Sequence, residues 1–174
     1  SGAWSKALNL SSLSDGSLSA SASQTDSAGN TGTGTGSATK DTSDPTVSIG
    51  AYTSPVNISN YDIVAVSGSC SENGRTVSLN ITSTGGGTAI NTSATCSSGA
   101  WSKTGLNLGG LGDGTITYTA SHTDAAGNST SASQTATKDT SAHAYSNTSF
   151  PTSSALIAAI IVSACASVSI IAVS

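Results

Sequence analysis

Two stretches of this chain repeat each other at a distance of about 98 residues. Residues 1–43 and 98–141 align throughout with one inserted residue, and about 25 of 43 positions are identical. The period matches the length of one β-sandwich domain and is much longer than the unit of a small solenoid. The chain is therefore predicted to divide into the C-terminal half of one repeat (1–43), a complete repeat (44–140) and a remaining segment (141–174).

The complete repeat is predicted to consist of short β-strands. Strands are expected at 46–50, 63–67, 75–81, 89–96, 101–108, 115–121 and 131–137. Two of them alternate strictly, which places Val77, Leu79 and Ile81 on one face, and Ile116, Tyr118 and Ala120 on another. The segments 72–75 and 124–128 supply the Gly and Asn residues that tight hairpins need. Short strands at regular spacing with turn signals between them predict an all-β sandwich of the immunoglobulin-like type.

The composition excludes some classes of function. Only 8% of the residues are charged and the net charge is −4, with five basic residues scattered along the chain. Binding of nucleic acid needs clustered Lys and Arg, so we expect no nucleic-acid partner. No Ser lies in a nucleophile elbow, no His–Asp pair suggests a triad, and Glu72 is the single glutamate. We therefore expect no catalytic residues, no enzymatic activity and no required cofactor.

A succession of short motifs carries a family resemblance. In order, these are GAW at 99–101, DGT at 113–115 with the alternating strand after it, TDAAGN at 123–128 and TKDTS at 137–141. Over residues 1–140 the chain resembles the bacterial immunoglobulin-like (Big-type) tandem repeats of large surface adhesins and repeat fibre proteins. The resemblance implies an extracellular protein of the cell surface, in which stacked Ig-like domains form an extended fibre, stalk or filament.

The same resemblance suggests partners. Neighbouring repeats of the same chain, or identical subunits that exchange strands, would be the main ones, with an unknown surface ligand beyond them. An alternative function is a module that binds carbohydrate or protein through the loops at 84–88 and 124–128, within a membrane-anchored surface protein. Few aromatic residues are available for a sugar site, and Trp4 and Trp101 hold equivalent repeat positions, which is typical of a structural role.

Cys70 and Cys96 fall within the complete repeat. A pair of cysteines in one domain of an exported chain is typical of a structural disulfide. The alternative is two buried free thiols. A zinc site is not expected, because His122 and His143 are too isolated to complete a set of four ligands.

Calcium is the metal that the sequence suggests. Asp41 and Asp44 lie in the linker before the complete repeat, and Asp124 and Asn128 lie in its last hairpin. Calcium takes six to eight oxygen ligands from such side chains and from backbone carbonyls. Similar repeats in large adhesins hold calcium at domain junctions. The other interpretation is that these residues cap turns without a metal.

The end of the chain allows two interpretations. Residues 155–174 contain no charge, and their length suits a membrane anchor. Many of these residues are Ser or β-branched, however, and no Lys or Arg flanks the segment. Residues 148–151 and 160–165 loosely match the start of the complete repeat, so the segment 141–174 is also interpretable as the diverged front of a further repeat. Cys165 would then pair outside this chain.

Overall fold

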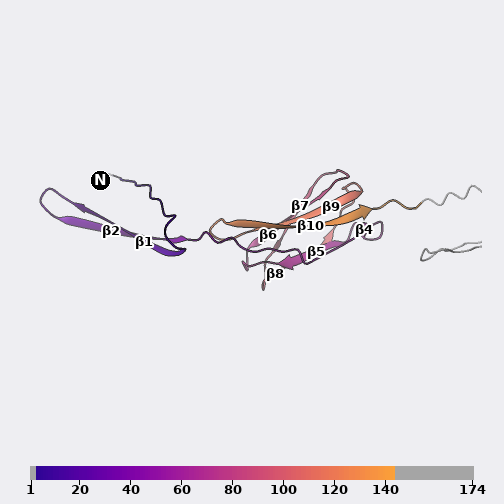
Figure 1. The fold of residues 1–174 in the computed structure, drawn as a ribbon, viewed down its shortest axis with the longest axis horizontal. Helices are drawn as coiled ribbons and strands as arrows, with labels where there is room; N and C mark the ends of the chain where they lie inside the picture. Colours follow the sequence, from indigo (N-terminus) through magenta and orange to yellow (C-terminus); the bar gives the residue numbers. More distant parts are fainter. Residues whose placement is uncertain (1–2, 144–174) are drawn as a thin grey trace, which may run out of the picture. The chain divides into compact units, whose positions relative to one another are not determined.

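The computed structural model describes residues 3–143, and all ten elements of that part of the chain are β-strands (Figure 1). They are β1 (Gly16–Thr25), β2 (Thr31–Lys40), β3 (Ala51–Tyr52), β4 (Val56–Asn57), β5 (Val64–Ser69), β6 (Thr76–Ser83), β7 (Ile90–Thr95), β8 (Ala100–Leu106), β9 (Gly114–Thr123) and β10 (Ser129–Asp139). Within the described residues no helix is long and apolar enough to span a membrane. The apolar segment 155–174 and Cys165 lie outside the described residues.

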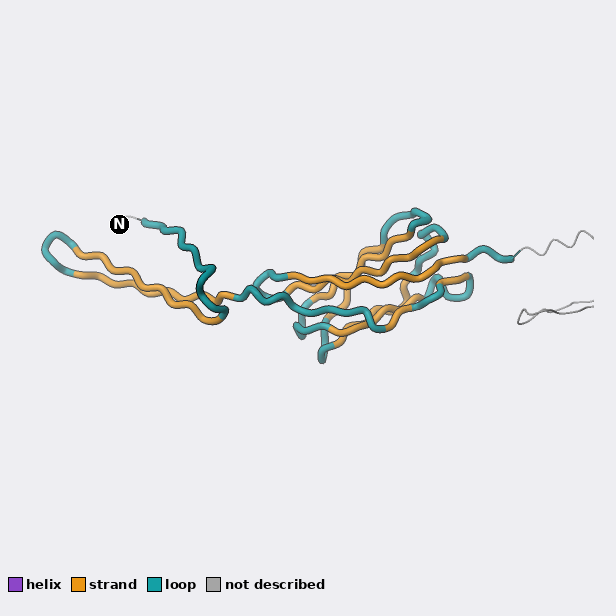
Figure 2. The backbone as a smooth tube through the Cα atoms, in the orientation of Figure 1, coloured by secondary structure: helices purple, strands orange, loops and turns teal. Residues whose placement is uncertain are grey.

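Strands β3 to β10 form a two-layered sandwich (Figures 1 and 2). One sheet has the order β4-β10-β9-β6-β7 and the other has the order β3-β5-β8. The pair β4–β10 is parallel, and every other pair in the two sheets is antiparallel. The predicted all-β sandwich is confirmed.

The core lies between the two sheets and follows the predicted alternation. Val77, Leu79 and Ile81 of β6 are buried, and so are Ile116, Tyr118 and Ala120 of the neighbouring β9. The two strands pair in register, with Leu79 opposite Ala120 and Ile81 opposite Tyr118. Cross-strand neighbours on one face of a sheet pack together and exclude water, which is the main stabilisation available to a chain with so few charges.

Trp101 connects β8, one edge strand of the smaller sheet, to the segment that precedes β3, the other edge strand. Its side chain is 3% exposed, and its Nε1 donates a 3.0 Å hydrogen bond to the carbonyl oxygen of Ser48. Gly68 lies beside both groups, and a Cβ at this position would fall 1.8 Å from that same oxygen. The absence of a side chain at Gly68 therefore allows the Ser48 backbone and the Trp101 ring to approach each other.

The predicted strand at 46–50 pairs with the chain at 67–71 but is not a regular strand. The Ser48 and Gly50 N–H groups donate to the carbonyl oxygens of Ser69 and Ser67, whereas Val47 makes an isolated bridge and β3 begins at Ala51. The reason is local, because Ser48 Oγ accepts a hydrogen bond from the Ser69 N–H and lies 2.8 Å from Ser69 Oγ. A side chain that occupies a backbone donor in this way interrupts the regular ladder.

Cys70 and Cys96 form a disulfide with a Cα–Cα distance of 6.0 Å. Cys70 follows β5 of the smaller sheet, and Cys96 follows β7 of the larger sheet. The bond therefore fastens one sheet to the other at one end of the sandwich.

Strands β1 and β2 form a separate antiparallel hairpin that precedes the sandwich in sequence. Its register runs from Gly16 opposite Lys40 to Thr25 opposite Thr31. The β9–β10 hairpin has the same register at the equivalent positions, from Gly114 opposite Lys138 to Thr123 opposite Ser129. The repeated sequence thus builds the same hairpin twice.

Candidate functional site

The end of each repeat is fastened by one aspartate. Lys138 Nζ lies 2.8 Å from Asp113 Oδ1, and the Thr140 backbone N–H and hydroxyl both donate to the same carboxylate. The hairpin at 1–43 has the same set, with Lys40 Nζ 2.7 Å from Asp15 Oδ1 and Thr42 donating to that carboxylate. We name each set an exit clasp, because it ties the start of one hairpin strand to the residues that leave the repeat.

Electrostatics explain why the clasp is ionised. The hydrogen bond from Lys138, followed by that from the Thr140 backbone, lowers the pKa of Asp113 from 3.8 to about 2. Asp15 has its pKa lowered in the same direction, chiefly by Lys40. Lys138 is 4% exposed, so its ammonium group needs this carboxylate as its partner. The clasp therefore fixes the point where the chain leaves a repeat and enters the linker.

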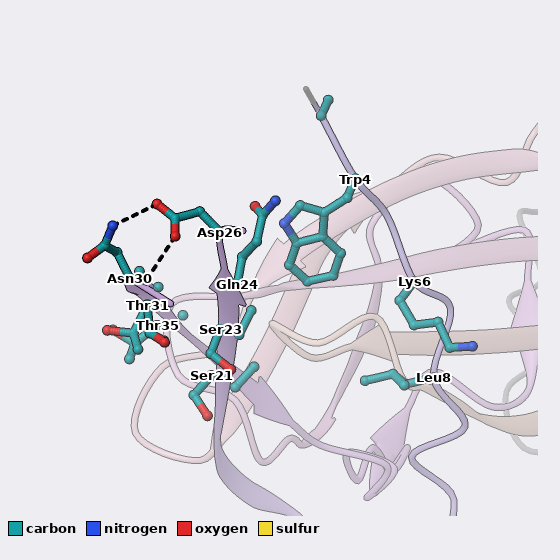
Figure 3. A pocket seen from close by; sticks show the side chains of 17 residues that line it. Trp4, Lys6, Leu8, Ser21, Ser23, Gln24, Asp26, Asn30, Thr31 and Thr35 are labelled. Atoms are coloured by element: carbon teal, nitrogen blue, oxygen red, sulfur yellow. Dashed lines mark hydrogen bonds between the residues drawn. The ribbon is translucent and has the colours of Figure 1, made fainter. Parts of the chain in front are cut away.

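The carboxylate of Asp124 is occupied by its own turn. It accepts hydrogen bonds from the Gly127 N–H, from the Asn128 N–H and from Asn128 Nδ2. The bond from the Asn128 side chain is the main cause that lowers the pKa of Asp124. Asp26 and Asn30 repeat this turn in the first hairpin (Figure 3). These interactions are those of a turn-capping aspartate.

Three of the four residues that the sequence suggests for calcium lie together. Asn128 Nδ2 donates to the Asp41 carbonyl oxygen at 3.2 Å as well as to Asp124. One oxygen of the Asp41 carboxylate accepts from the Ser43 N–H. Among the described residues, the Asp44 carboxylate accepts no hydrogen bond, and no group of three or more His, Cys, Asp or Glu residues gathers as a metal set. The free oxygens are thus at Asp41 and Asp44 rather than in the Asp124 turn.

The glycine-rich loop at 84–88 packs against the backbone of the exit clasp. A Cβ on Gly85 would lie 2.0 Å from the Asp113 carbonyl oxygen, and a Cβ on Gly87 would lie 2.2 Å from the Gly110 carbonyl oxygen. Ser83 Oγ also donates to the Gly112 carbonyl oxygen. Gly85 and Gly87 are therefore required by close backbone contact, and the loop supports Asp113.

His122 is a buried core residue whose structural role the sequence did not indicate. The Glu72 backbone N–H donates to its Nε2 at 3.2 Å, and its Nδ1 lies 3.1 Å from the Thr76 carbonyl oxygen. Nε2 thus acts as an acceptor, and Nδ1 lies within donating distance of the Thr76 carbonyl oxygen. His122 belongs to β9, and its hydrogen bond with the Glu72 N–H holds the turn before β6 against this strand. The alternation of β9, in which every second residue is apolar, was the signal that could have identified it.

The segment that precedes the first hairpin has exposed apolar side chains. Trp4, Leu8, Leu10 and Leu13 are exposed, whereas the equivalent Trp101, Leu106, Leu108 and Leu111 are buried in the sandwich. Trp4, Lys6 and Leu8 line an open groove together with residues 20–24, Asp26 and residues 30–36 (Figure 3). The exposed fraction is 75% for Trp4 and 3% for Trp101. The difference marks a surface that is core in one repeat and open in the other.

Comparison with known proteins places this fold among repeat regions of adhesins. One similar solved structure is a tetra-tandem repeat in the extending region of a large adhesion protein, with 30% identity and a TM-score of 0.53. That match covers 76% of this chain and 34% of the other. The chain thus spans about a third of the length of that structure. No family model matches the chain, and no curated protein does.

Two further solved structures are similar at lower TM-scores. One is a Ca²⁺-stabilised, ice-binding adhesin of an Antarctic bacterium, with 34% identity and a TM-score of 0.42, and the match covers 75% of this chain and 33% of the other. The second is a 1.5-MDa bacterial ice-binding adhesin, with 31% identity and a TM-score of 0.39, and the match covers 73% of this chain and 43% of the other.

Proposed function

We propose that this chain is a structural segment of an extended adhesin, in which Ig-like repeats follow one another and add length. The observation that carries the proposal is the duplicated exit clasp. Asp15 with Lys40 and Asp113 with Lys138 fasten the last hairpin of two successive repeats in the same way. A device that recurs where each repeat ends sets the direction of the linker each time, which is what a regular array requires.

The domain division supports the same role. Residues 1–43 are the C-terminal half of one repeat of the bacterial Ig-like type, 44–140 are a complete repeat, and 141–174 are a linker with an apolar segment. The similarity to a tetra-tandem repeat of an extending region, at 30% identity, supports a spacer role. The protein is extracellular and belongs to the cell surface. Its partners are the neighbouring repeats.

The structure favours this role over a ligand-binding module. The two loops that the sequence offers for a ligand are engaged within the domain, since 84–88 packs on the clasp backbone and the 124–128 turn binds its own Asp124. A domain whose loops are engaged in this way would add length to the protein and resist proteases. The proposal includes no catalytic activity.

Calcium at the linker is a second proposal. Asp41 and Asp44 supply two carboxylates to the linker, and the turn at 124–128 contacts this linker through the hydrogen bond from Asn128 Nδ2 to the Asp41 carbonyl oxygen. Carboxylates and backbone carbonyls are the ligands that calcium prefers. An ion here would stiffen the linker between two repeats.

The spacer function is tested with concatemers of residues 44–141. Small-angle scattering of two, four and eight copies should give a maximum dimension that grows in proportion to the number of repeats. The matched control carries Asp113→Asn and Lys138→Met in every repeat, which removes the clasp while keeping the length. Parent concatemers that are compact, with a maximum dimension that rises much more slowly than the copy number, would contradict the proposal.

A further inference from the structure

Two copies of one sequence stretch have different environments in this chain. Trp4 and Trp101, within the shared segment GAWSK, are exposed and buried respectively. In the sandwich, residues 100–103 of this segment lie in β8 and pair with β5, while residues 3–10 form no strand. The sandwich therefore shows what the exposed copy lacks.

The strands that pair with β8 and β9 show what covers the equivalent face in the sandwich. Strand β6 pairs along the edge of β9 that faces away from β10, from Val77 opposite His122 to Ser83 opposite Ile116. Among residues 3–143, the equivalent edge of β1 pairs with no strand, and β1 pairs with β2 alone. All of the cover, including β5, β6 and Ser48, comes from residues 44–97. An exposed apolar face with an open strand edge is a site for strand addition.

We propose that the open face of residues 3–40 is a docking surface for an N-terminal half-repeat with the pattern of residues 44–97, joined directly ahead of Ser1. The inference rests on the proposed function, because it takes the hairpin as half of a repeat. The occupant would bring one alternating apolar strand to the free edge of β1 and a second strand to residues 3–8. It would also bring a carbonyl oxygen to the indole of Trp4.

Stoichiometry argues against a second copy as the occupant. Residues 3–143 contain two C-terminal halves and one N-terminal half, and the latter already covers β8 and β9. Exchange of this half between identical molecules would cover one face only by exposing another. Connectivity points to a covalent source, because in the sandwich only residues 96–99 separate β7 from β8, with a bridge from Ser97 to Ala100. A half-repeat joined ahead of Ser1 would enter by the same short connection and at high effective concentration.

The test adds the half-repeat to the full chain. A second copy of residues 44–97 is fused directly ahead of Ser1, which reproduces the sequence around Ser97. Trp101→Phe leaves Trp4 as the single tryptophan. Compared with the unfused W101F chain, the fusion should shift Trp4 emission to shorter wavelength and reduce its quenching by acrylamide several-fold. The matched control fusion carries Leu79→Asp and Ile81→Asp in the added copy only, and it should leave Trp4 exposed.

Hydrogen exchange provides a reporter that needs no tryptophan substitution. In the fusion with both tryptophans intact, the β1 amides that face away from β2 should become protected, and in the control fusion they should exchange as in the unfused chain. If Trp4 stays quenchable and these amides stay unprotected while β9 and β10 remain protected, the docking surface is wrong. That result would leave the spacer proposal standing, because the concatemers contain only complete repeats. Protection of Trp4 in the unfused chain, accompanied by a dimer mass, would assign the face to a second copy and overturn the proposal.

Discussion

Lys138 and Asp113 are 25 residues apart in sequence, and their side chains form an ion pair of 2.8 Å at the C-terminal end of the sandwich. Lys40 and Asp15 form the same pair at the same separation of 25 residues in the first hairpin. The pair recurs although one hairpin lies in a sandwich and the other has no second sheet among the described residues. The residues of the hairpin and its exit are thus sufficient to form the clasp, and the loop at 84–88 adds a backbone contact to Asp113 in the sandwich.

Removal of the clasp in the sandwich should lower its stability. Asp113→Asn leaves the buried Lys138 ammonium without a charged partner, so we expect the Tm of the full chain to fall by several degrees in calorimetry. The matched control is Asp15→Asn, which breaks the equivalent pair outside the sandwich. It should leave the main transition in place. Equal effects of the two variants would show that the clasp does not stabilise the sandwich itself.

The free energy of unfolding should depend on pH through the protonation of Asp113. Its pKa is lowered in the folded protein from 3.8 to about 2, so the unfolded chain takes up the proton first as the pH falls. The contribution is therefore fully present above the ordinary pKa and is lost as the pH falls from about 4 through about 2. Urea unfolding between these pH values should show a steeper loss for the parent chain than for Asp113→Asn. Parallel curves would argue against the shift.

Loss of the disulfide should cost more than any single hydrogen bond. The bond between Cys70 and Cys96 closes a loop of 26 residues, which predicts a stabilisation of about 3–4 kcal/mol. We expect Cys70→Ala/Cys96→Ala to reduce the free energy of unfolding by this amount in urea titration. The parent chain under reducing conditions should match the double variant. A chain whose stability is indifferent to reductant would contradict a structural role for the disulfide.

The backbone contact beside Asp113 predicts that two nearby glycines differ in their tolerance of substitution by alanine. Gly85→Ala would place a Cβ 2.0 Å from the Asp113 carbonyl oxygen, whereas a Cβ on Gly110 meets nothing within 4 Å. We expect Gly85→Ala to destabilise the sandwich by about 1–3 kcal/mol or more, and Gly110→Ala to be nearly neutral. Chemical denaturation of the two variants compares them directly. Similar losses would indicate that the loop at 84–88 relaxes easily.

Calcium should act through the linker. Sites in extracellular modules bind calcium with dissociation constants of about 10⁻⁴–10⁻³ M, so millimolar calcium should raise the Tm relative to EDTA. The variant Asp41→Asn/Asp44→Asn should lose this rise and keep the Tm in EDTA. Asp124→Asn should lower the Tm in both buffers, because its carboxylate caps the turn at 124–128. A Tm unchanged by calcium would remove the metal proposal.

Much of the sandwich follows from local sequence pattern. The alternation at 75–81 and 115–121 predicted the core strands β6 and β9, and the buried residues are those that the pattern placed on one face. The turn at 124–128 follows from Asp, Gly and Asn at fixed offsets, and the same turn forms at Asp26. Such features are decided within a few residues, because turn geometry and side-chain direction are local.

Long-range features could not be read from the pattern. The alternation of β9 places His122 on the buried face, but it does not reveal the two backbone partners of the ring. It likewise gives no sign that Gly85 lies against the Asp113 carbonyl oxygen. The two-residue strand β4, which pairs in parallel with β10, was likewise not predicted. These contacts join residues from distant parts of the chain, and their energies depend on the packing of the whole domain.

The segment GAWSK separates what the sequence determined from what tertiary structure decided. It occurs twice with identical letters, around Trp4 and around Trp101. The sequence by itself determined the period, the hairpins, the turns and the exit clasps, since each of these forms in both halves. Only the tertiary structure decided that Trp101 is buried in β8 while Trp4 is exposed, because a strand needs a neighbour for its backbone hydrogen bonds and an apolar face needs a second sheet to exclude water.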